Sequence, residues 1–314
     1  MTPTAFKMLY ERSACILGEG AVIERLRRNS GFELDPHIVN SAFIYDEPKR
    51  ESLAAIYRQY LDIGCQFDLP LILSTPTWRA SQERISEAGY AQKDVNRDNF
   101  RFLDTLRTSY GSYAGKVAIC GLMSCRGDAF NPDEALSATE ARTFHAWQAE
   151  RLAEAGVDFL LAATLPALSE AIGLSAALSD TGMPYIISFV ARPQGTLIDG
   201  TPLKEAIQRI DAEVSPKPLT YIVNCTHASI FRQALFHEVN SSPLVRLRIG
   251  GLLANTAALK PEELDDRENL VTEAPKIFGQ AVGDLKNDLG MKVLGGCCGT
   301  DDRHIRQLAK RIAQ

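Results

Sequence analysis

Short apolar runs alternate along this chain with longer amphipathic stretches. The apolar runs span residues 14–19, 69–75, 117–123, 157–164, 185–191, 219–225, 248–255 and 291–297. Their apolar residues follow one another without a regular polar alternation, which is typical of strands buried on both faces of a parallel sheet. The stretches between them, such as 140–156 and 203–213, carry charged residues at helical spacing. The pattern therefore predicts a strand followed by a helix, repeated eight times.

Eight such units close naturally into a barrel, so the fold class that we predict is α/β, a (β/α)8 TIM barrel. A doubly wound open sheet is the alternative, but "LGEGAVIERL" after the first run has only one glycine spacing of the Gly-x-Gly-x-x-Gly kind. The long connection 20–68 contains "NSAFIYDEP", which we expect to form an extra strand or an ordered excursion over the barrel mouth, with a lid or a decoration without function as the alternatives. No linker or low-complexity tract divides the sequence, which predicts a single domain over residues 1–314.

Composition and charge argue against several classes of protein. Hydrophobic residues make up 45% and charged residues 23%, and the net charge of −5 comes without a basic cluster, so we expect no nucleic-acid partner. No segment has the apolar core of a signal peptide or the length of a membrane span, which predicts a cytoplasmic protein without a membrane partner. The seven cysteines are odd in number and scattered, which favours reduced thiols over a disulfide framework.

Three of the cysteines stand at predicted strand ends. Cys225 ends the sixth run, and "VLGGCCGT" places Cys297 and Cys298 side by side at the end of the eighth. Barrels carry their chemistry at this end of the strands, and the flanking glycines let the backbone turn so that both neighbours can face one point. Three thiolates at one point make a tetrahedral Zn²⁺ site with an open fourth position, as in catalytic zinc. A redox-active pair of adjacent thiols is the alternative.

The remaining cysteines are expected to have other roles. We interpret Cys15, Cys65 and Cys120 as small buried apolar residues. Cys125, in "MSCRGD", follows a predicted strand, and we interpret it as an incidental loop cysteine, with a reactive thiol as the alternative.

The motifs "VNC" at 223–225 and "GGCCGT" at 295–300 resemble the homocysteine S-methyltransferase family, and the segments 74–81, 144–161 and 187–207 are similar to family segments in the same order. The resemblance implies that Cys225, Cys297 and Cys298 hold Zn²⁺, and that the enzyme transfers a methyl group from an activated donor to a zinc-bound thiol, homocysteine, giving methionine. It implies a small-molecule thiol and a methyl donor as partners. A homo-oligomer and a separate methyl-carrier protein stay open, because no nucleotide fingerprint or appended carrier domain identifies the donor.

The sequence departs from the family at two positions that bind the amino-acid part of the substrate. Gly18 occupies the position of an aspartate, and Ala163 stands where a glutamate is expected. Glu19 could restore one contact by a shift of one residue, or it could be a solvated loop charge. These departures leave open an enzyme for a different thiol, or a zinc-binding barrel that has lost activity.

Other candidates for substrate binding follow the second and seventh runs. Thr75 and Trp78 come after the second, where Trp78 could offer its π face to a cationic methyl donor or simply pack in a loop. Asn255 ends the seventh run and matches the family's asparagine, which would fix a substrate carboxylate or a loop. His227 could support the cysteine site or be structural. Thr300 is expected to cap the last helix.

Overall fold

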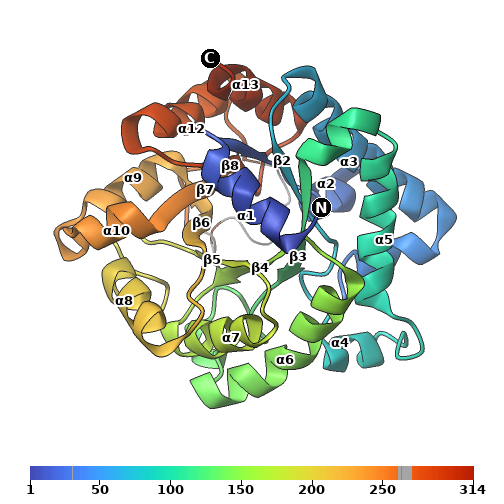
Figure 1. Cartoon of the computed structure of the whole chain (residues 1–314), viewed down its shortest axis with the longest axis horizontal. Helices are drawn as coiled ribbons and strands as arrows, with labels where there is room; N and C mark the ends of the chain where they lie inside the picture. The colour runs from blue at the N-terminus through green and yellow to red at the C-terminus, as the bar shows by residue number, and fades with distance from the viewer. Residues whose placement is uncertain (30, 261–262, 264–270) are drawn as a thin grey trace.

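The centre of the molecule is a closed barrel of parallel strands, as the computed structural model of residues 1–29, 31–260, 263 and 271–314 shows (Figure 1). Each strand pairs with its neighbours in sequence, and β1 pairs with β8 to close the barrel. The eight strands coincide with the eight predicted runs, with β4 and β6 extending one and two residues beyond theirs, which confirms the (β/α)8 barrel. They are β1 Ile16–Gly18, β2 Leu71–Ser74, β3 Val117–Met123, β4 Phe159–Leu165, β5 Tyr185–Phe189, β6 Thr220–His227, β7 Ile249–Asn255 and β8 Val293–Gly296.

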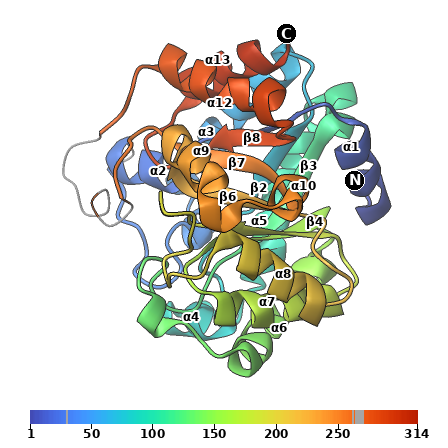
Figure 2. The same cartoon turned by 90° about the vertical axis from the view of Figure 1, so that its left-hand side faces the viewer.

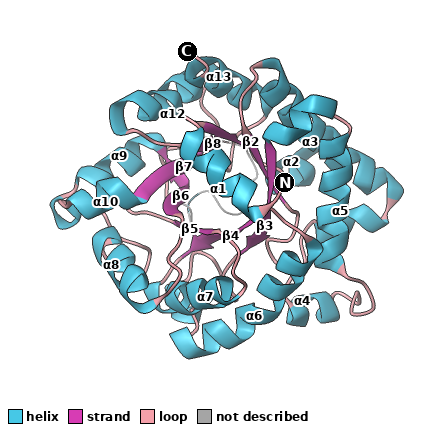
Figure 3. Cartoon of the chain, viewed as in Figure 1, coloured by secondary structure: helices cyan, strands magenta, loops and turns pink. Residues whose placement is uncertain are grey.

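Helices surround the strands on the outside, and α1 lies across one end of the barrel (Figure 3). They are α1 Pro3–Arg12, α2 Ile23–Asn29, α3 Glu47–Gln66, α4 Gln82–Glu87, α5 Val95–Thr108, α6 Ala138–Ala155, α7 Leu168–Asp180, α8 Leu203–Glu213, α9 Ala228–Phe236, α10 Pro243–Arg248, α12 Pro275–Leu289 and α13 Asp302–Ile312. Their ends follow local chemistry: α6 begins with a capping box of Ser137 and Glu140 and ends at Gly156, which has a φ of 96°. Among the described residues, no helix is both long and apolar enough to cross a membrane.

The connection between β1 and β2 contains α2, a short 3-10 helix and α3. The prediction of an extra strand over 40–48 is wrong, because Ser41–Tyr45 form the 3-10 helix η1. Phe43 and Ile44 are adjacent in sequence and both buried, a pattern that a helical turn accommodates and a strand with one solvated face does not. Asp46 then caps α3 by accepting a hydrogen bond from the Lys49 amide. The segment is an ordered excursion, and Asn40 at its start lines the cavity described below.

Helix α1 covers the amino-terminal end of the barrel (Figure 2). Its Phe6 is fully buried and stacks on Phe159 of β4, with ring centroids 3.8 Å apart. Lys292, just before β8, donates to the carbonyl of Tyr10 on the same helix. Burial of one such aromatic side chain stabilises the fold by about 2 kcal/mol, so α1 is part of the barrel core.

All seven cysteines are free thiols, as predicted. Cys15 and Cys120 are buried, which agrees with the prediction, but the prediction for Cys65 is wrong because it is exposed. It lies on the solvent side of α3, because the neighbouring Gly64 takes the face that packs against β2 and the segment before β3. Cys125 is buried just after β3, and burial raises its pKa to about 11. That shift argues against the reactive-thiol alternative.

Candidate active site

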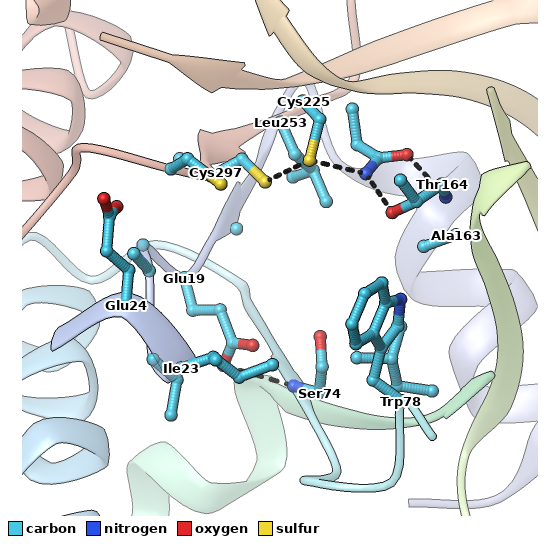
Figure 4. A pocket seen from close by; sticks show the side chains of 18 of the residues that line it. Glu19, Ile23, Glu24, Ser74, Trp78, Ala163, Thr164, Cys225, Leu253 and Cys297 are labelled. Atoms are coloured by element: carbon cyan, nitrogen blue, oxygen red, sulfur yellow. Dashed lines mark hydrogen bonds between the residues drawn. The ribbon is translucent and has the colours of Figure 1, made fainter. Parts of the chain in front are cut away.

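A cavity of about 450 Å³ opens at the carboxyl-terminal ends of the strands, where barrels carry their chemistry (Figure 4). Its depth is apolar, with Phe159 and Leu161 of β4 on the wall. The polar groups stand above them, with the cysteines on one side and Glu19 and Ser74 on the other (Figure 4). A pocket of this size and composition suits a small molecule held by a few polar contacts.

The sulfurs of Cys225, Cys297 and Cys298 lie within 4.8 Å of one another, and those of Cys225 and Cys297 are 2.9 Å apart. Sulfurs that bind one zinc ion at about 2.3 Å in a tetrahedron are about 3.8 Å from each other. Small side-chain adjustments would bring the three to that spacing, so this donor set fits zinc. In the described part of the chain, no second group of three metal-binding side chains lies so close.

A bulge in β6 turns Cys225 toward the cavity. The register with β7 shifts between Asn224 and Thr226, and Cys225 has a φ of 50°, in the left-handed region that residues with a side chain rarely adopt. This backbone costs about 1–2 kcal/mol. In return, the adjacent Asn224 and Cys225 both line the cavity, whereas a regular strand would point them to opposite sides.

Asn224 is the centre of a buried hydrogen-bond network beside the cysteines. Its Nδ2 donates to Cys225 Sγ at 3.4 Å and to Thr164 Oγ1 at 2.7 Å. Its Oδ1 accepts from the Thr164 amide at 2.9 Å and from Ser188 Oγ at 2.6 Å. Thr164 itself has a φ of 61° at a bulge in β4, so Asn224 ties two irregular strand ends together. The sequence marked Asn224 through the "VNC" motif but gave no sign of this network.

The turn after β8 presents the other two thiols. The Cys297 amide donates to the carbonyl of Ala254 at 2.7 Å, which fixes the turn to β7. Gly299 has a φ of 84°, and its amide donates to the Glu24 carboxylate on α2. Cys297 and Cys298 therefore both line the cavity, as the flanking glycines predicted.

Thr300 completes this turn in a different way from the prediction. Its hydroxyl donates to the Cys297 carbonyl at 2.6 Å and accepts from the Ala21 amide at 2.9 Å, which joins the end of β8 to the loop after β1. The prediction that Thr300 caps the last helix is wrong by one residue. Asp301 is the N-cap of α13, because its carboxylate accepts from the Arg303 and His304 amides.

Hydrogen bonds among the three thiols shift their pKa values in different directions. Hydrogen bonds from Cys225 and Cys298 hold the pKa of Cys297 well below its usual range. Donation to Cys297 raises the pKa of Cys225, and donation within the same cluster raises that of Cys298. One thiolate thus forms readily, and its charge opposes ionisation of the other two until a cation is present.

Glu19 faces the cavity on the side opposite the cysteines (Figure 4). It is half-buried, and its Oε2 accepts from the Ser74 amide at 3.2 Å. Burial raises its pKa to about 8, and the hydrogen bond from Ser74 opposes this shift. The alternative of a solvated loop charge is therefore wrong, while the substrate-binding role stays a prediction.

The two positions that depart from the family pattern both line the cavity without a polar side chain. A Cβ atom on Gly18 would lie 2.9 Å from Leu253 Cδ2 and 3.1 Å from Gly295 Cα. Leu253 therefore fills the space beside Gly18, and an acidic side chain there would have to displace it. Ala163 is buried and lines the cavity near Thr164 (Figure 4).

The remaining substrate-binding candidates, Thr75, Trp78 and Asn255, differ in whether their side chains are available to a bound molecule. Thr75 borders the cavity, but its hydroxyl is 2.6 Å from Thr77 Oγ1 and accepts from the Leu122 amide at 3.0 Å, so it supports the loop. Trp78 faces the cavity (Figure 4), with the Arg79 guanidinium 4.4 Å from its ring centroid. Asn255 is 2% exposed and lines the cavity, and its Oδ1 has no hydrogen-bond partner among the described residues. A buried acceptor of this kind is available to a bound group.

His227 has a structural role. Its Nδ1 accepts from the Ser229 amide at 3.2 Å, which caps α9. Its Nε2 lies 3.6 Å from a carboxylate oxygen of Glu273. The imidazole therefore joins the end of β6 to the segment before α12.

The sequence matches known proteins over most of its length. The sequence model of the family described as "Homocysteine S-methyltransferase" matches residues 16–312. Betaine–homocysteine S-methyltransferase 1 of Bos taurus is 24% identical over 95% of this chain and 72% of its own length. Homocysteine S-methyltransferase YbgG of Bacillus subtilis is 23% identical over 94% of this chain and 93% of its own.

A solved structure shares the fold over almost the whole chain. The metallated form of the homocysteine methyltransferase MmuM from Escherichia coli covers 98% of this chain and 99% of its own, with a TM-score of 0.77 and 20% identity. The family match extends from the first strand to the last helix and includes all three cysteines. The chain belongs to the homocysteine S-methyltransferase family and is a thiol S-methyltransferase.

Proposed function

We propose that this protein is a zinc-dependent S-methyltransferase in which Cys225, Cys297 and Cys298 hold the metal. The observation that carries the proposal is the convergence of three sulfurs within 4.8 Å on the wall of the cavity. Thiolates are soft ligands that suit zinc, and three protein ligands leave the fourth position to a substrate. The metallated form of MmuM supports a metal in this fold.

Zinc bound there supplies the activation of the acceptor, because coordination deprotonates a thiol whose ordinary pKa is about 8.5. The chain's own residues hold the geometry. Asn224 orients Cys225 through its N–H···S contact, and Thr300 holds the carbonyl of Cys297. The apolar depth of the cavity excludes water from the reacting sulfur, which keeps it a strong nucleophile.

The methyl donor would lie against Trp78. A sulfonium or quaternary ammonium group carries a positive charge that the π face of an indole attracts. Glu19 faces the same space and offers a negative charge when ionised (Figure 4). The chain would act on free small molecules in the cytoplasm or take its methyl group from a separate carrier protein.

Homocysteine is the acceptor that the relatives support, since the named enzymes act on it, and methionine would be the product. A second acceptor class is favoured by one observation: Gly18, Ala163 and Leu253 line the cavity, and none of them offers a charge to a substrate ammonium group. A thiol of similar length without the α-amino group would fit these positions.

Metal analysis of purified protein followed by an acceptor and donor screen tests the proposal. We expect one zinc per chain and methyl transfer to homocysteine or to a related thiol. Zinc without transfer to any thiol would identify a barrel that has lost activity. Protein without metal, but with a titratable disulfide between Cys297 and Cys298, would identify a redox protein.

A further inference from the structure

The loop between β3 and α6 forms part of the cavity wall. Its residues Asp128, Ala129 and Phe130 line the cavity, and the 3-10 helix Pro132–Glu134 follows them. Ala129 is buried, while Asp128 and Glu134 on the same loop are exposed. A surface loop of this length usually moves unless other elements hold it.

One buried carboxylate contacts both ends of this loop. Glu170, on α7, is completely buried. Its Oε1 accepts from the Arg126 amide at 2.7 Å, where the loop leaves β3. Its Oε2 accepts from the Leu136 amide at 3.4 Å, just before α6 begins. The two amides are ten positions apart in sequence, so the carboxylate joins the two ends of the loop as a latch.

A buried histidine completes the environment of this carboxylate. His145 Nε2 lies 2.9 Å from Glu170 Oε1, and the histidine is 1% exposed. With the proton on Nε2, the imidazole donates a third hydrogen bond to the carboxylate. Burial of a carboxylate is unfavourable unless such donors satisfy it, so α6, α7 and the loop must keep this arrangement together.

A second residue holds the first half of the same loop. Arg79, which follows β2, donates to the carbonyls of Cys125 at 2.8 Å and Gly127 at 2.5 Å. Arg79 also stacks on Trp78, which faces the cavity. The loop after β3 is thus fixed to the loop after β2 at its start and to Glu170 at both ends.

We propose that Glu170 is a positioning residue whose carboxylate joins the two ends of the loop 126–136. It thereby holds Asp128, Ala129 and Phe130 against the cavity. It touches no substrate itself. For catalysis the inference rests on the proposed function, since the loop would border the methyl donor and acceptor. The rigidity of the loop does not depend on that function and can be measured separately.

Hydrogen–deuterium exchange of Glu170→Gln tests the latch. A glutamine replaces one acceptor oxygen with an NH₂ group, so in either orientation an N–H of the side chain meets a backbone N–H. We expect exchange of the amides in 126–136 to become at least about tenfold faster, with the zinc content unchanged. Glu154→Gln is the matched control, because Glu154 lies on the exposed side of α6 and pairs with Arg151. Unchanged loop exchange in folded Glu170→Gln would overturn the proposal.

The unmodified protein gives a second test that does not require a variant to fold. The Arg126 and Leu136 amides should exchange at least about a hundredfold more slowly than in an unstructured peptide, although they belong to a surface loop. Exchange at the unstructured rate would overturn the latch.

Kinetics then separate positioning from general loss of structure. We expect Glu170→Gln to raise KM for the donor or acceptor by about fivefold or more with kcat within about twofold, and Glu170→Asp to restore part of the change. A fall in kcat at constant KM would argue against the positioning role. If neither the unmodified protein nor any variant transfers methyl groups, the proposed function fails. The exchange experiment still tests whether Glu170 holds the loop.

Discussion

The cysteine cluster and the two cavity positions that depart from the family pattern differ in how tightly the fold specifies them. On the cysteine side, the bulge at Cys225, the network of Asn224 and the glycine turn at 299 fix the thiols through buried hydrogen bonds. At the two departing positions, Gly18 of β1 and Ala163 of β4 contribute no polar side chain, and Leu253 fills the space beside Gly18. The first arrangement depends on a few exact contacts, and the second on volume and apolar surface.

This difference separates activation from recognition. The groups that would activate a thiol are held by strained backbone and by a network with several partners, which a single substitution can break. The positions Gly18 and Ala163, where the family pattern would recognise the rest of the acceptor, are apolar here, and apolar positions tolerate changes of similar volume. The substitutions below test each side in turn.

The largest effect is expected for Cys225→Ser, Cys297→Ser and Cys298→Ser. A hydroxyl ionises reluctantly and binds zinc poorly, so each variant should lose most of its zinc and about a thousandfold or more of its activity. Zinc analysis by mass spectrometry and initial rates check this. Near-stoichiometric zinc in all three variants would contradict the proposed metal site.

Removal of the metal from the unmodified protein is the control for folding. A barrel core of this size does not depend on one ion, so chelated protein should keep its circular dichroism and a cooperative thermal transition. Complete unfolding on chelation would indicate a structural metal instead.

The next effect concerns Asn224, which supports the cysteine side. Asn224→Ala would leave the Thr164 amide and the Ser188 hydroxyl buried without their partner, and we expect a loss of about 2–4 kcal/mol in the free energy of unfolding. Urea denaturation measures it, with Asn287→Ala on the exposed side of α12 as the control. A change below about 0.5 kcal/mol would show that the network is not important for stability.

Ala163, one of the two departing positions, should respond in the direction of gain. Ala163→Glu adds a carboxylate to the cavity and should raise the affinity for homocysteine by about tenfold, which corresponds to about 1.4 kcal/mol. Ala163→Gln is the control of equal size without the charge. If Ala163→Glu and Ala163→Gln bind homocysteine with equal affinity, charge recognition lies elsewhere in the cavity.

Gly18→Asp alone should destabilise the protein, because the new side chain would collide with Leu253. The double variant with Leu253→Ala should be tolerated better.

The smallest effect is a dependence of stability on pH that arises from Glu19. Burial raises the pKa of Glu19 from 4.5 to about 8, so between these values the folded protein holds a proton that the unfolded chain releases. Rising pH therefore favours the unfolded state. The contribution of protonated Glu19 to the stability of the fold is lost as pH passes through 8. Glu19→Gln does not titrate, so its Tm relative to the unmodified protein should increase from pH 5 to pH 9 in metal-free samples. A difference in Tm that is independent of pH would contradict the raised pKa.

The strands and the convergence of the cysteines could be predicted from the sequence, because buried parallel strands are apolar throughout and the strand ends of a barrel meet at one face. The bulge at Cys225 could not, since no glycine marks the left-handed residue. The space-filling role of Leu253 could not either, because only barrel closure brings β8 beside β1 and the Leu253 side chain of β7 within reach of Gly18. The exposure of Cys65 depends on which face of α3 packs inward, which the residue type does not indicate.

Helix α1 has a consequence for the order of events during turnover. Phe6 stacks on Phe159, whose ring lines the depth of the cavity, so α1 closes the barrel at the end opposite the cysteines. Both substrates and both products would then share one entrance. Each product must therefore leave through this opening before the next pair of substrates enters, and we expect added product to lower the initial rate of methyl transfer.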